Sequence, residues 1–143
     1  MRVAFVRHIG PYSQVGPTWG KLMSWAGMRG LLGPSTQILG IVHDDPRITP
    51  AEKVRYDAAI TVPPHVTPEG EVGVMDLIGG QFATLLHRGP YDTIGESYDK
   101  LFGVWLPQSG REVRDEPGFE IYLNSPFNTA PQDLLTILHI PVA

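Results

Sequence analysis

The sequence contains no cysteine, so the fold cannot depend on disulfide bridges or on a zinc site with Cys/His spacing. It also lacks a charged and then apolar leader, and it has no apolar run near the roughly 18 residues that a membrane-spanning helix needs. Neither secretion nor membrane insertion is indicated. We therefore expect a cytoplasmic protein without a membrane partner.

Basic residues are few and scattered. Lysine and arginine number 11 against 15 aspartate and glutamate residues, which gives a formal net charge of −4. Because nucleic-acid binding needs a basic face, the sequence predicts no direct nucleic-acid partner. The HExxH, P-loop, GxGxxG and GxSxG motifs are absent too, so we predict no metal and no cofactor.

The bulk composition is that of one globular domain. The chain has 143 residues, of which 42% are hydrophobic, 18% charged and 9% aromatic. This length can bury a core without metal or disulfide support, whereas two independent domains would be small. We expect a single domain over residues 1–143.

A short motif occurs twice, as HIGPY at residues 8–12 and as HRGPY at residues 87–91, with an offset of 79. The same offset aligns apolar residues that follow each motif with steps of 4, 3, 1 and 3, which predicts one amphipathic helix in each copy. The aligned residues are Val15, Trp19, Leu22, Met23 and Ala26 in the first copy and Ile94, Tyr98, Leu101, Phe102 and Trp105 in the second.

Predicted strands surround each helix. Extended runs at 3–9 and 82–88 precede the helices, and strands at 36–46 and 55–63 follow the first helix as those at 117–126 and 134–141 follow the second. Ser13 and Asp92 are expected near the helix N-termini, where a short oxygen-bearing side chain can accept a hydrogen bond from the exposed N–H groups or interact favourably with the positive end of the helix dipole. The chain therefore reads as two β-α-β-β halves, about 1–63 and about 71–143.

The connection between the halves predicts a hairpin. The segments 71–78 and 81–88 flank Gly79 and Gly80, a turn pair that favours a tight connection. Segments 63–70 and 106–117 are rich in proline, glycine and charge, so we expect loops there. Together the halves predict an α+β fold with one antiparallel sheet, two helices on one face and a ligand cleft along a pseudo-two-fold axis.

The two copies differ at one position that suggests chemistry. With the offset of 80 that applies to this strand, Leu39 aligns with Phe119 and Ile41 with Ile121, but Gly40 aligns with Glu120. Strand alternation then predicts two sets of side chains, with Phe119, Ile121 and Leu123 in the core and Glu120, Tyr122 and Asn124 facing the cleft.

A carboxylate in an aromatic cleft must be hydrated, paired with a protein cation, or available to a cationic ligand. Aromatic rings stabilise such a ligand by cation–π contact. The alternative is that Glu120 lies on a solvated sheet face. The candidate ligand-binding residues are Glu120, Tyr122, Tyr91, Trp105, Trp25 and Tyr12, whereas Tyr98 and Trp19 lie on the helical stripes and are expected to pack in the core.

Other titratable residues favour structural interpretations. Arg55 and Asp57 lie two apart on one strand face, where they could pair with each other, reach into the cleft or orient Glu120. His8 and His87 occupy matching repeat positions, which favours a shared role in the corner over catalysis. His43, Asp44 and Asp45 precede a proline, and aspartate there is typical of a turn.

Several stretches together resemble one known family. They are the two HxGPY motifs, HDDPRITPAEKVRYDAAITVP, GGQFATLLHRGPY and GFEIYLNSP. In these the chain is similar, over nearly its whole length, to the GyrI-like small-molecule-binding family. That family includes the DNA gyrase inhibitory protein and the effector-binding domains of AraC-type and MerR-type multidrug regulators.

The resemblance implies a duplicated, SHS2-like β-α-β-β module with a central cleft for amphipathic, often cationic or aromatic, compounds. In effector-binding relatives an acidic residue of the late strand contacts the ligand, and Glu120 matches that position. A stand-alone, non-enzymatic binding or sensing protein is the leading hypothesis. The alternatives are a hydrolase of cyclopropane-containing genotoxic compounds, with Glu120 as general base, and a protein that modulates DNA gyrase.

Two departures from the family pattern carry expectations. Relatives start with a strand ahead of the segment that matches residues 3–9, so we expect an exposed sheet edge here and, through it, a homodimer. No helix-turn-helix extension is present, so the chain is not by itself a complete regulator of the AraC or MerR type.

Overall fold

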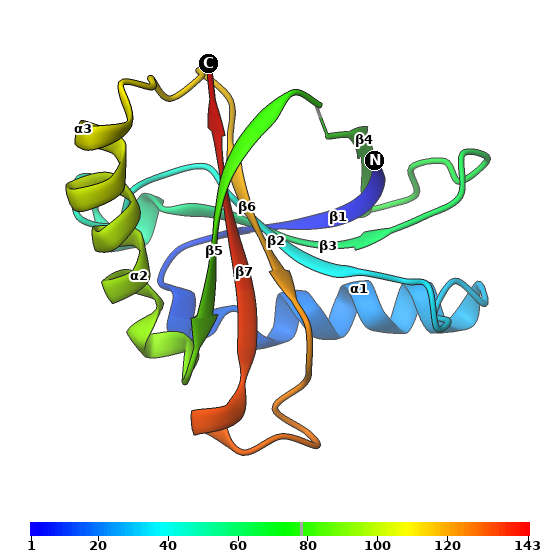
Figure 1. Ribbon diagram of the computed structural model, residues 1–143. Coiled ribbons are helices and arrows are strands. Elements are labelled where there is room, and N and C mark those ends of the chain that lie inside the picture. The colour runs from blue at the N-terminus through cyan, green and yellow to red at the C-terminus, as the bar shows by residue number, and fades with distance from the viewer. Residues whose placement is uncertain (78) are drawn as a thin grey trace. The chain divides into compact units, whose positions relative to one another are not determined.

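The structure is a computed structural model that describes residues 1–77 and 79–143. The chain divides into two compact units, Met1–Gly79 and Gly80–Ala143 (Figure 1), and each is described by itself. Ile78, at the end of the predicted strand 71–78, lies outside the described residues. No helix in the described part of the chain is long and apolar enough to cross a membrane.

The first unit is an antiparallel sheet with one long helix. Its strands lie in the order β4-β1-β3-β2, and helix α1 packs along β1 and β3 (Figure 1). The helix presents Leu22 and Ala26 to a buried cluster that includes Val6, Ala58 and Ile60. The elements are β1 (Arg2–Ile9), α1 (Gly16–Met28), β2 (Ile38–Val42), β3 (Arg55–Thr61) and β4 (Gly73–Asp76).

The second unit repeats this plan with three strands in the order β6-β7-β5. Helix α2 packs on β5, and a buried cluster of Ala83, Ile94, Leu101, Leu138 and Ile140 joins them. The elements are β5 (Gln81–Arg88), α2 (Ile94–Lys100), η4 (Leu101–Trp105), α3 (Leu106–Ser109), β6 (Gly118–Tyr122) and β7 (Leu135–Val142). Both units therefore have the β-α-β-β order that the repeat predicts.

The predicted hairpin across Gly79 and Gly80 is wrong. Strand β4 pairs with β1 in the first unit, with Val3 opposite Met75. The Phe5 side chain fixes this pairing, because a Cβ atom on Gly73 would lie only 2.6 Å from the Phe5 ring. The ring thus occupies the space that glycine leaves open. As a result, the expected exposed edge of β1 is covered by β4 over Arg2–Phe5.

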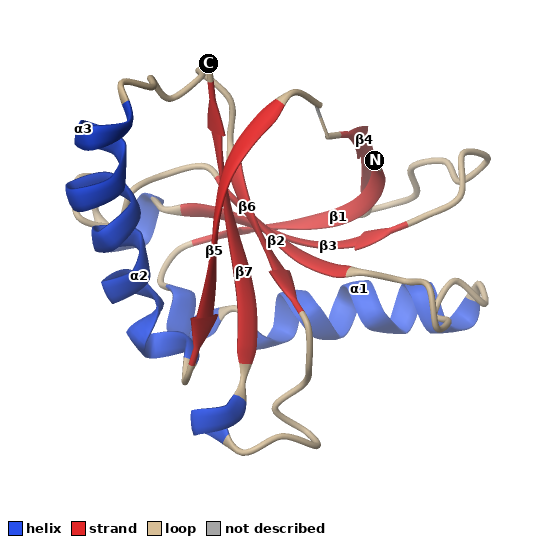
Figure 2. Ribbon diagram, in the orientation of Figure 1, coloured by secondary structure: helices blue, strands red, loops and turns tan. Residues whose placement is uncertain are grey.

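The second helix is longer and less regular than predicted. Segments α2, η4 and α3 form one continuous helical segment (Figure 2), in which η4 is a π-helical turn. The loop predicted from residue 106 therefore begins only after Ser109. A π-turn contains one residue more than an α-turn, so it rotates the residues after it out of the stripe. Trp105 is consequently 40% exposed, while the aligned Ala26 is fully buried.

The HxGPY motif makes the same corner in both units. The His87 Nε2–H donates to the Pro90 carbonyl (3.2 Å) and the Ser97 hydroxyl donates to His87 Nδ1 (2.7 Å). His8 likewise donates to the Pro11 carbonyl at 2.8 Å, and the Thr18 hydroxyl lies 3.4 Å from its Nδ1. The structural role predicted for both histidines is confirmed, since each ties the turn to the helix.

The predicted hydrogen-bonding caps are wrong, whereas a favourable interaction of Asp92 with the helix dipole stays a prediction. Ser13 and Asp92 lie in short 3₁₀ turns, η1 (Tyr12–Gln14) and η3 (Tyr91–Thr93), ahead of the helices. Among the described residues, no side chain caps the N-terminus of α1 or α2 by a hydrogen bond. The prediction failed because the histidine corner adds a turn of 3₁₀ helix between the Gly-Pro pair and each α-helix.

Candidate functional site

Glu120 lies in the middle of β6, on the face of the sheet that packs against α2. It is opposite Leu138, which is in turn opposite Leu85 on β5. Because directly opposite residues in antiparallel strands share a face, Glu120 faces the same side as the helix-packed core. The prediction that Glu120 faces away from the core is therefore wrong, whereas the predicted burial of Phe119 and Ile121 is confirmed. Phe119 and Ile121 are buried on the other face, and Leu123 is 51% exposed.

Two tyrosines hold the Glu120 carboxylate. The Tyr98 hydroxyl donates to Oε2 at 3.1 Å, and the Tyr122 hydroxyl donates to Oε1 at 3.1 Å. Tyr91 packs against the Tyr122 ring with a centroid distance of 5.4 Å. Glu120 itself is only 6% exposed. Within residues 1–77 and 79–143, the hydrogen-bond partners of this carboxylate are phenols and none is a cation.

The surroundings shift the acidity of this cluster. Burial raises the pKa of Glu120 to about 7, although the hydrogen bonds from Tyr122 and Tyr98 pull the pKa downwards. Burial also raises the pKa of Tyr91, and the negative charge of Glu120 adds to that effect. The carboxyl group therefore exchanges its proton near neutral pH, where both of its protonation states are accessible.

The local sequence explains how the tyrosines reach the carboxylate. Ser97 is tied to His87 in the corner, so the next residue, Tyr98, is held at a fixed height above the sheet. Tyr98 was expected to pack in the core and the structure shows that it also binds Glu120, a role that an apolar stripe does not reveal. Tyr122 is two residues from Glu120 on the same strand face, as alternation predicts.

Thr136 adds a second buried polar group to this face. It lies on β7 directly opposite Tyr122, and its side chain is fully buried. Its Oγ1 has no hydrogen-bond partner among the described residues. Buried hydroxyl groups without a partner are uncommon in folded proteins, so this oxygen can still accept or donate one hydrogen bond.

The other predicted aromatic residues lie elsewhere in the two units. Trp105 lines an open hollow of about 220 Å³ together with Ala83, Leu85 and Leu101. Trp25, in the first unit, donates a long hydrogen bond of 3.4 Å to Glu69. Tyr12, also in the first unit, packs edge-on against Tyr56 at 5.5 Å. A ligand role for these three residues stays a prediction.

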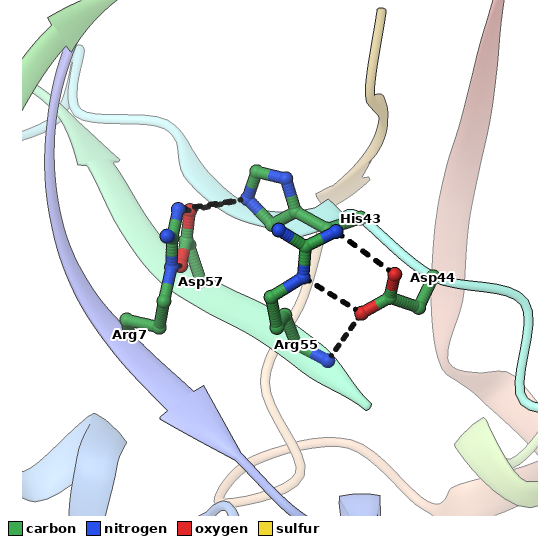
Figure 3. A network of polar contacts seen from close by, with 5 residues as sticks. All are labelled: Arg7, His43, Asp44, Arg55 and Asp57. Carbon is green, nitrogen blue, oxygen red and sulfur yellow. Dashed lines mark hydrogen bonds and ion pairs between the residues drawn. The ribbon is translucent and has the colours of Figure 1, made fainter. Parts of the chain in front are cut away.

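A second polar cluster lies in the first unit, on the face of its sheet that does not pack against α1 (Figure 3). Asp57 is fully buried, and the Arg7 guanidinium donates to both of its oxygens at 2.8 and 3.1 Å. The His43 Nε2–H donates to Asp57 Oδ2 at 2.6 Å. Burial acts to raise the pKa of Asp57, but the bonds from His43 and Arg7 outweigh it and hold the pKa below its usual range.

Neighbouring acids in this cluster have separate partners. Arg55 pairs with Asp44 at 2.9 and 3.0 Å (Figure 3), so the alternative in which Arg55 pairs with Asp57 is wrong. The hydrogen bonds from Arg55 lower the pKa of Asp44 to about 2. Asp45 accepts from the backbone N–H of Arg47 at 2.8 Å, which confirms its predicted role in the turn before Pro46.

Comparison with known proteins assigns the chain to a family. Residues 1–143 match the GyrI-like small molecule binding domain, and the protein belongs to that family. A relative from Escherichia coli (strain K12), a DNA gyrase inhibitor, is 33% identical over 127 residues, which cover 86% of this chain and 80% of the relative. The family resemblance of the sequence motifs is thus confirmed.

Three solved structures share the α+β fold. The EcmrR C-terminal domain matches 99% of this chain and 90% of its own length, with a TM-score of 0.79 at 20% identity. A hydrolase encoded by lin2189 from Listeria innocua matches 100% of this chain and 87% of its own, with a TM-score of 0.69 at 14% identity. SAV2435 bound to tetraphenylphosphonium matches 99% and 89%, with a TM-score of 0.63 at 15% identity.

Proposed function

We propose that this protein binds an amphipathic small molecule, cationic or aromatic, at the cluster formed by Glu120, Tyr91, Tyr98 and Tyr122. The observation that carries the proposal is the buried Glu120 carboxylate, whose partners in the described chain are two phenols. The family to which the chain belongs is one of small-molecule binding domains.

The physical argument concerns charge compensation. An ionised carboxylate in an apolar environment costs several kcal/mol unless a positive charge compensates it, so a bound cation stabilises the ionised form of Glu120. Each tyrosine ring that faces the cation adds about 0.5 to 2 kcal/mol of cation–π attraction. The Thr136 hydroxyl offers one further hydrogen bond to a ligand that carries a polar group.

Isothermal calorimetry with tetraphenylphosphonium tests the proposal, because the fold relative SAV2435 was solved with that cation. We expect wild-type protein to bind it and Glu120→Gln to bind at least about tenfold more weakly, which corresponds to about 1.4 kcal/mol. Glu112→Gln is the matched control, since Glu112 is an exposed glutamate of the same unit. Absence of binding by the wild type, or equal binding by Glu120→Gln, would refute the proposal.

The pH dependence of binding gives an independent check. Since burial raises the pKa of Glu120 to about 7, a cation must displace its proton below that pH. Affinity should therefore increase from pH 6 to pH 8 in the wild type and stay flat in Glu120→Gln. If the affinity of the wild type does not change with pH, the ligand does not bind at this carboxylate.

Hydrolysis is a second candidate function, and the raised pKa of Glu120 favours it. A carboxylate with a pKa of about 7 is well matched to accept a proton from water at neutral pH. The hydroxide would add to one carbon of a strained ring, and the proton would go to the carbon that loses the ring bond. Time-dependent product formation from a cyclopropane-containing compound, absent in Glu120→Gln, would distinguish catalysis from stoichiometric binding.

Modulation of DNA gyrase is a third candidate, favoured by the gyrase inhibitor that is 33% identical to this chain. A supercoiling assay with purified gyrase tests it. Inhibition that persists in Glu120→Gln would assign it to a surface other than the carboxylate cluster. Full supercoiling activity at a large excess of this protein would exclude this candidate.

A further inference from the structure

Strand β5 forms one end of the strand order in the second unit, with β7 as its neighbour. Just beyond β5, the Gly89 N–H donates to the Leu134 carbonyl at 2.9 Å, so odd-numbered residues of β5 bond to β7. The backbone groups of Phe82, Thr84 and Leu86 therefore point to the outer side. These outward groups form a ready template for another strand.

The middle of the β5 edge lacks the features that usually protect such a template, while charged groups lie at its two ends, where the Arg114 guanidinium donates to the Gln81 carbonyl at 3.0 Å and Arg88 ends the strand. Natural edge strands are short, charged or interrupted by proline. Strand β4, at the end of the first unit, follows this rule, because it has four residues and its last one, Asp76, pairs with Arg2 at 3.7 Å. Strand β5 has eight residues, and the stretch Gln81–Leu86 contains neither a charged residue nor a proline.

A hollow runs beside this edge. It has a volume of about 220 Å³ and is lined by Ala83, Thr84, Leu85, Leu101 and Trp105, with Lys100 at its rim. The hollow lies between β5 and the helical segment, whose Leu101 packs with Ala83 and Leu85. Trp105, which the π-turn leaves 40% exposed, forms an apolar wall of this hollow.

We infer that β5 pairs antiparallel with β5 of a second copy of this chain, around a two-fold axis at Thr84. In that register Thr84 lies opposite Thr84 of the second copy, Phe82 opposite Leu86, and Ala83 opposite Leu85. The outward groups of Phe82, Thr84 and Leu86 then make about six interchain hydrogen bonds. The leucine opposite Ala83 enters the hollow that the small alanine side chain leaves open.

The side chains of β5 are complementary to those of a second β5 strand in this register. We therefore propose a second copy of the chain, and not an unrelated peptide, as the binding partner. A two-fold axis perpendicular to a sheet keeps each side chain on its face, so Phe82 meets Leu86 on one face and Ala83 meets Leu85 on the other. Aromatic–aliphatic pairs directly opposite each other stabilise antiparallel sheets. Leu86, which is 55% exposed in the single chain, becomes covered.

Cysteine cross-linking tests the register directly, because the chain has no cysteine of its own. Thr84→Cys places two thiols opposite each other across the axis, within reach of a disulfide. Mild oxidation should convert most of the Thr84→Cys protein to a covalent dimer. Leu123→Cys is the control, since this residue is 51% exposed but lies outside β5. Equal cross-linking of the two variants, or none at Thr84, would overturn the inference.

Sedimentation velocity provides the second test. Wild-type protein should sediment as a dimer, and Thr84→Pro as a monomer, because proline removes an outward N–H and leaves the bonds to β7 intact. Thr84→Val, which keeps the N–H and the side-chain shape, should remain a dimer. If Thr84→Pro fails to fold, Leu86→Lys takes its place and should be monomeric. A monomeric wild type, or a dimeric Leu86→Lys, would refute the pairing.

Discussion

The two units use one backbone plan but place their polar groups on opposite faces of it. On the helix-packed face, the first unit has Gly40 beside Ala58, and the Trp19 ring packs edge-on against Tyr56 at 6.4 Å. At the aligned positions the second unit has Glu120 beside Leu138, with Tyr98 bound to the carboxylate. The same space is filled by aromatic rings in one unit and by a phenol-bound acid in the other.

On the sheet face that does not pack against the helices, the buried acid lies in the first unit and the apolar residues in the second. In the first unit, the buried Asp57 pairs with Arg7 and His43. The aligned residues of the second unit are all apolar, namely Ile137, Leu86 and Leu123. All three positions of the ionic cluster therefore differ between the copies, and the second unit has no counterpart of it. A duplicated frame tolerates one buried acid on either face, provided that its hydrogen-bonding neighbours are present.

The strongest way to break this comparison is to remove Asp57. Asp57→Ala leaves Arg7 and His43 without their acceptor, and should lower the free energy of unfolding by about 3 kcal/mol. The triple variant Arg7→Leu, His43→Leu, Asp57→Ile copies the apolar pattern of the second unit and should come within about 1 kcal/mol of wild type. Urea denaturation measures both. A triple variant as unstable as Asp57→Ala would show that the two faces are not interchangeable.

Glu120, the buried acid of the second unit, should make the free energy of unfolding depend on pH. A carboxyl group with a higher pKa when folded binds its proton more tightly in the native state. Its contribution to stability is complete below the unfolded pKa of about 4.3 and is lost as pH rises through about 7. Between pH 5 and pH 8, Glu120→Gln should therefore gain about 2 to 3 kcal/mol relative to wild type in urea unfolding.

Glu112→Gln serves as the control for that experiment. Its stability should follow the wild type across the same pH range, because the Glu112 side chain is exposed. A constant difference between Glu120→Gln and the wild type would mean that the carboxyl group has an ordinary acidity.

The smallest expected effect sharpens the comparison of the two corners. His87 is 6% exposed and has a short bond of 2.7 Å to Ser97, whereas His8 is less deeply buried and its contact with Thr18 is 3.4 Å long. His87→Ala should lower the free energy of unfolding by about 2 kcal/mol and His8→Ala by about 1 kcal/mol. Urea denaturation of both variants at one pH measures these losses. Equal losses in the free energy of unfolding would contradict the difference in hydrogen-bond geometry between the two corners.

Local sequence information was sufficient for the elements of the fold. The repeat, the strands and the corner histidines could be predicted because each depends on residues that lie close together in the chain. The position of β4 could not, since its partner β1 lies at the far end of the first unit and the Gly79-Gly80 pair indicated a nearer one. The π-turn was also missed, because the apolar steps of the second copy are identical to those of a regular helix.

The candidate site was predicted in part. Alignment of the copies singled out Glu120, and alternation added Tyr122, but Tyr98 was assigned to the core since its ring lies on an apolar stripe. The cluster around Asp57 could have been found by the same alignment, as its three members are all replaced by apolar residues in the second copy. Burial was what the sequence could not supply, and burial decides the pKa of Glu120.

The π-turn also accounts for a detail of the chain's history. The offset between the copies is 79 up to Leu22 and Leu101 but 80 from Leu39 and Phe119 onward, so the second copy is one residue longer in between. The π-turn at Leu101–Trp105 lies in that interval and is the conformation that takes up a single extra residue inside a helix. An extra residue at this point leaves the strands undisturbed and brings Trp105 into register with the half-buried Trp25, instead of with the fully buried Ala26 that the offset of 79 aligns with it.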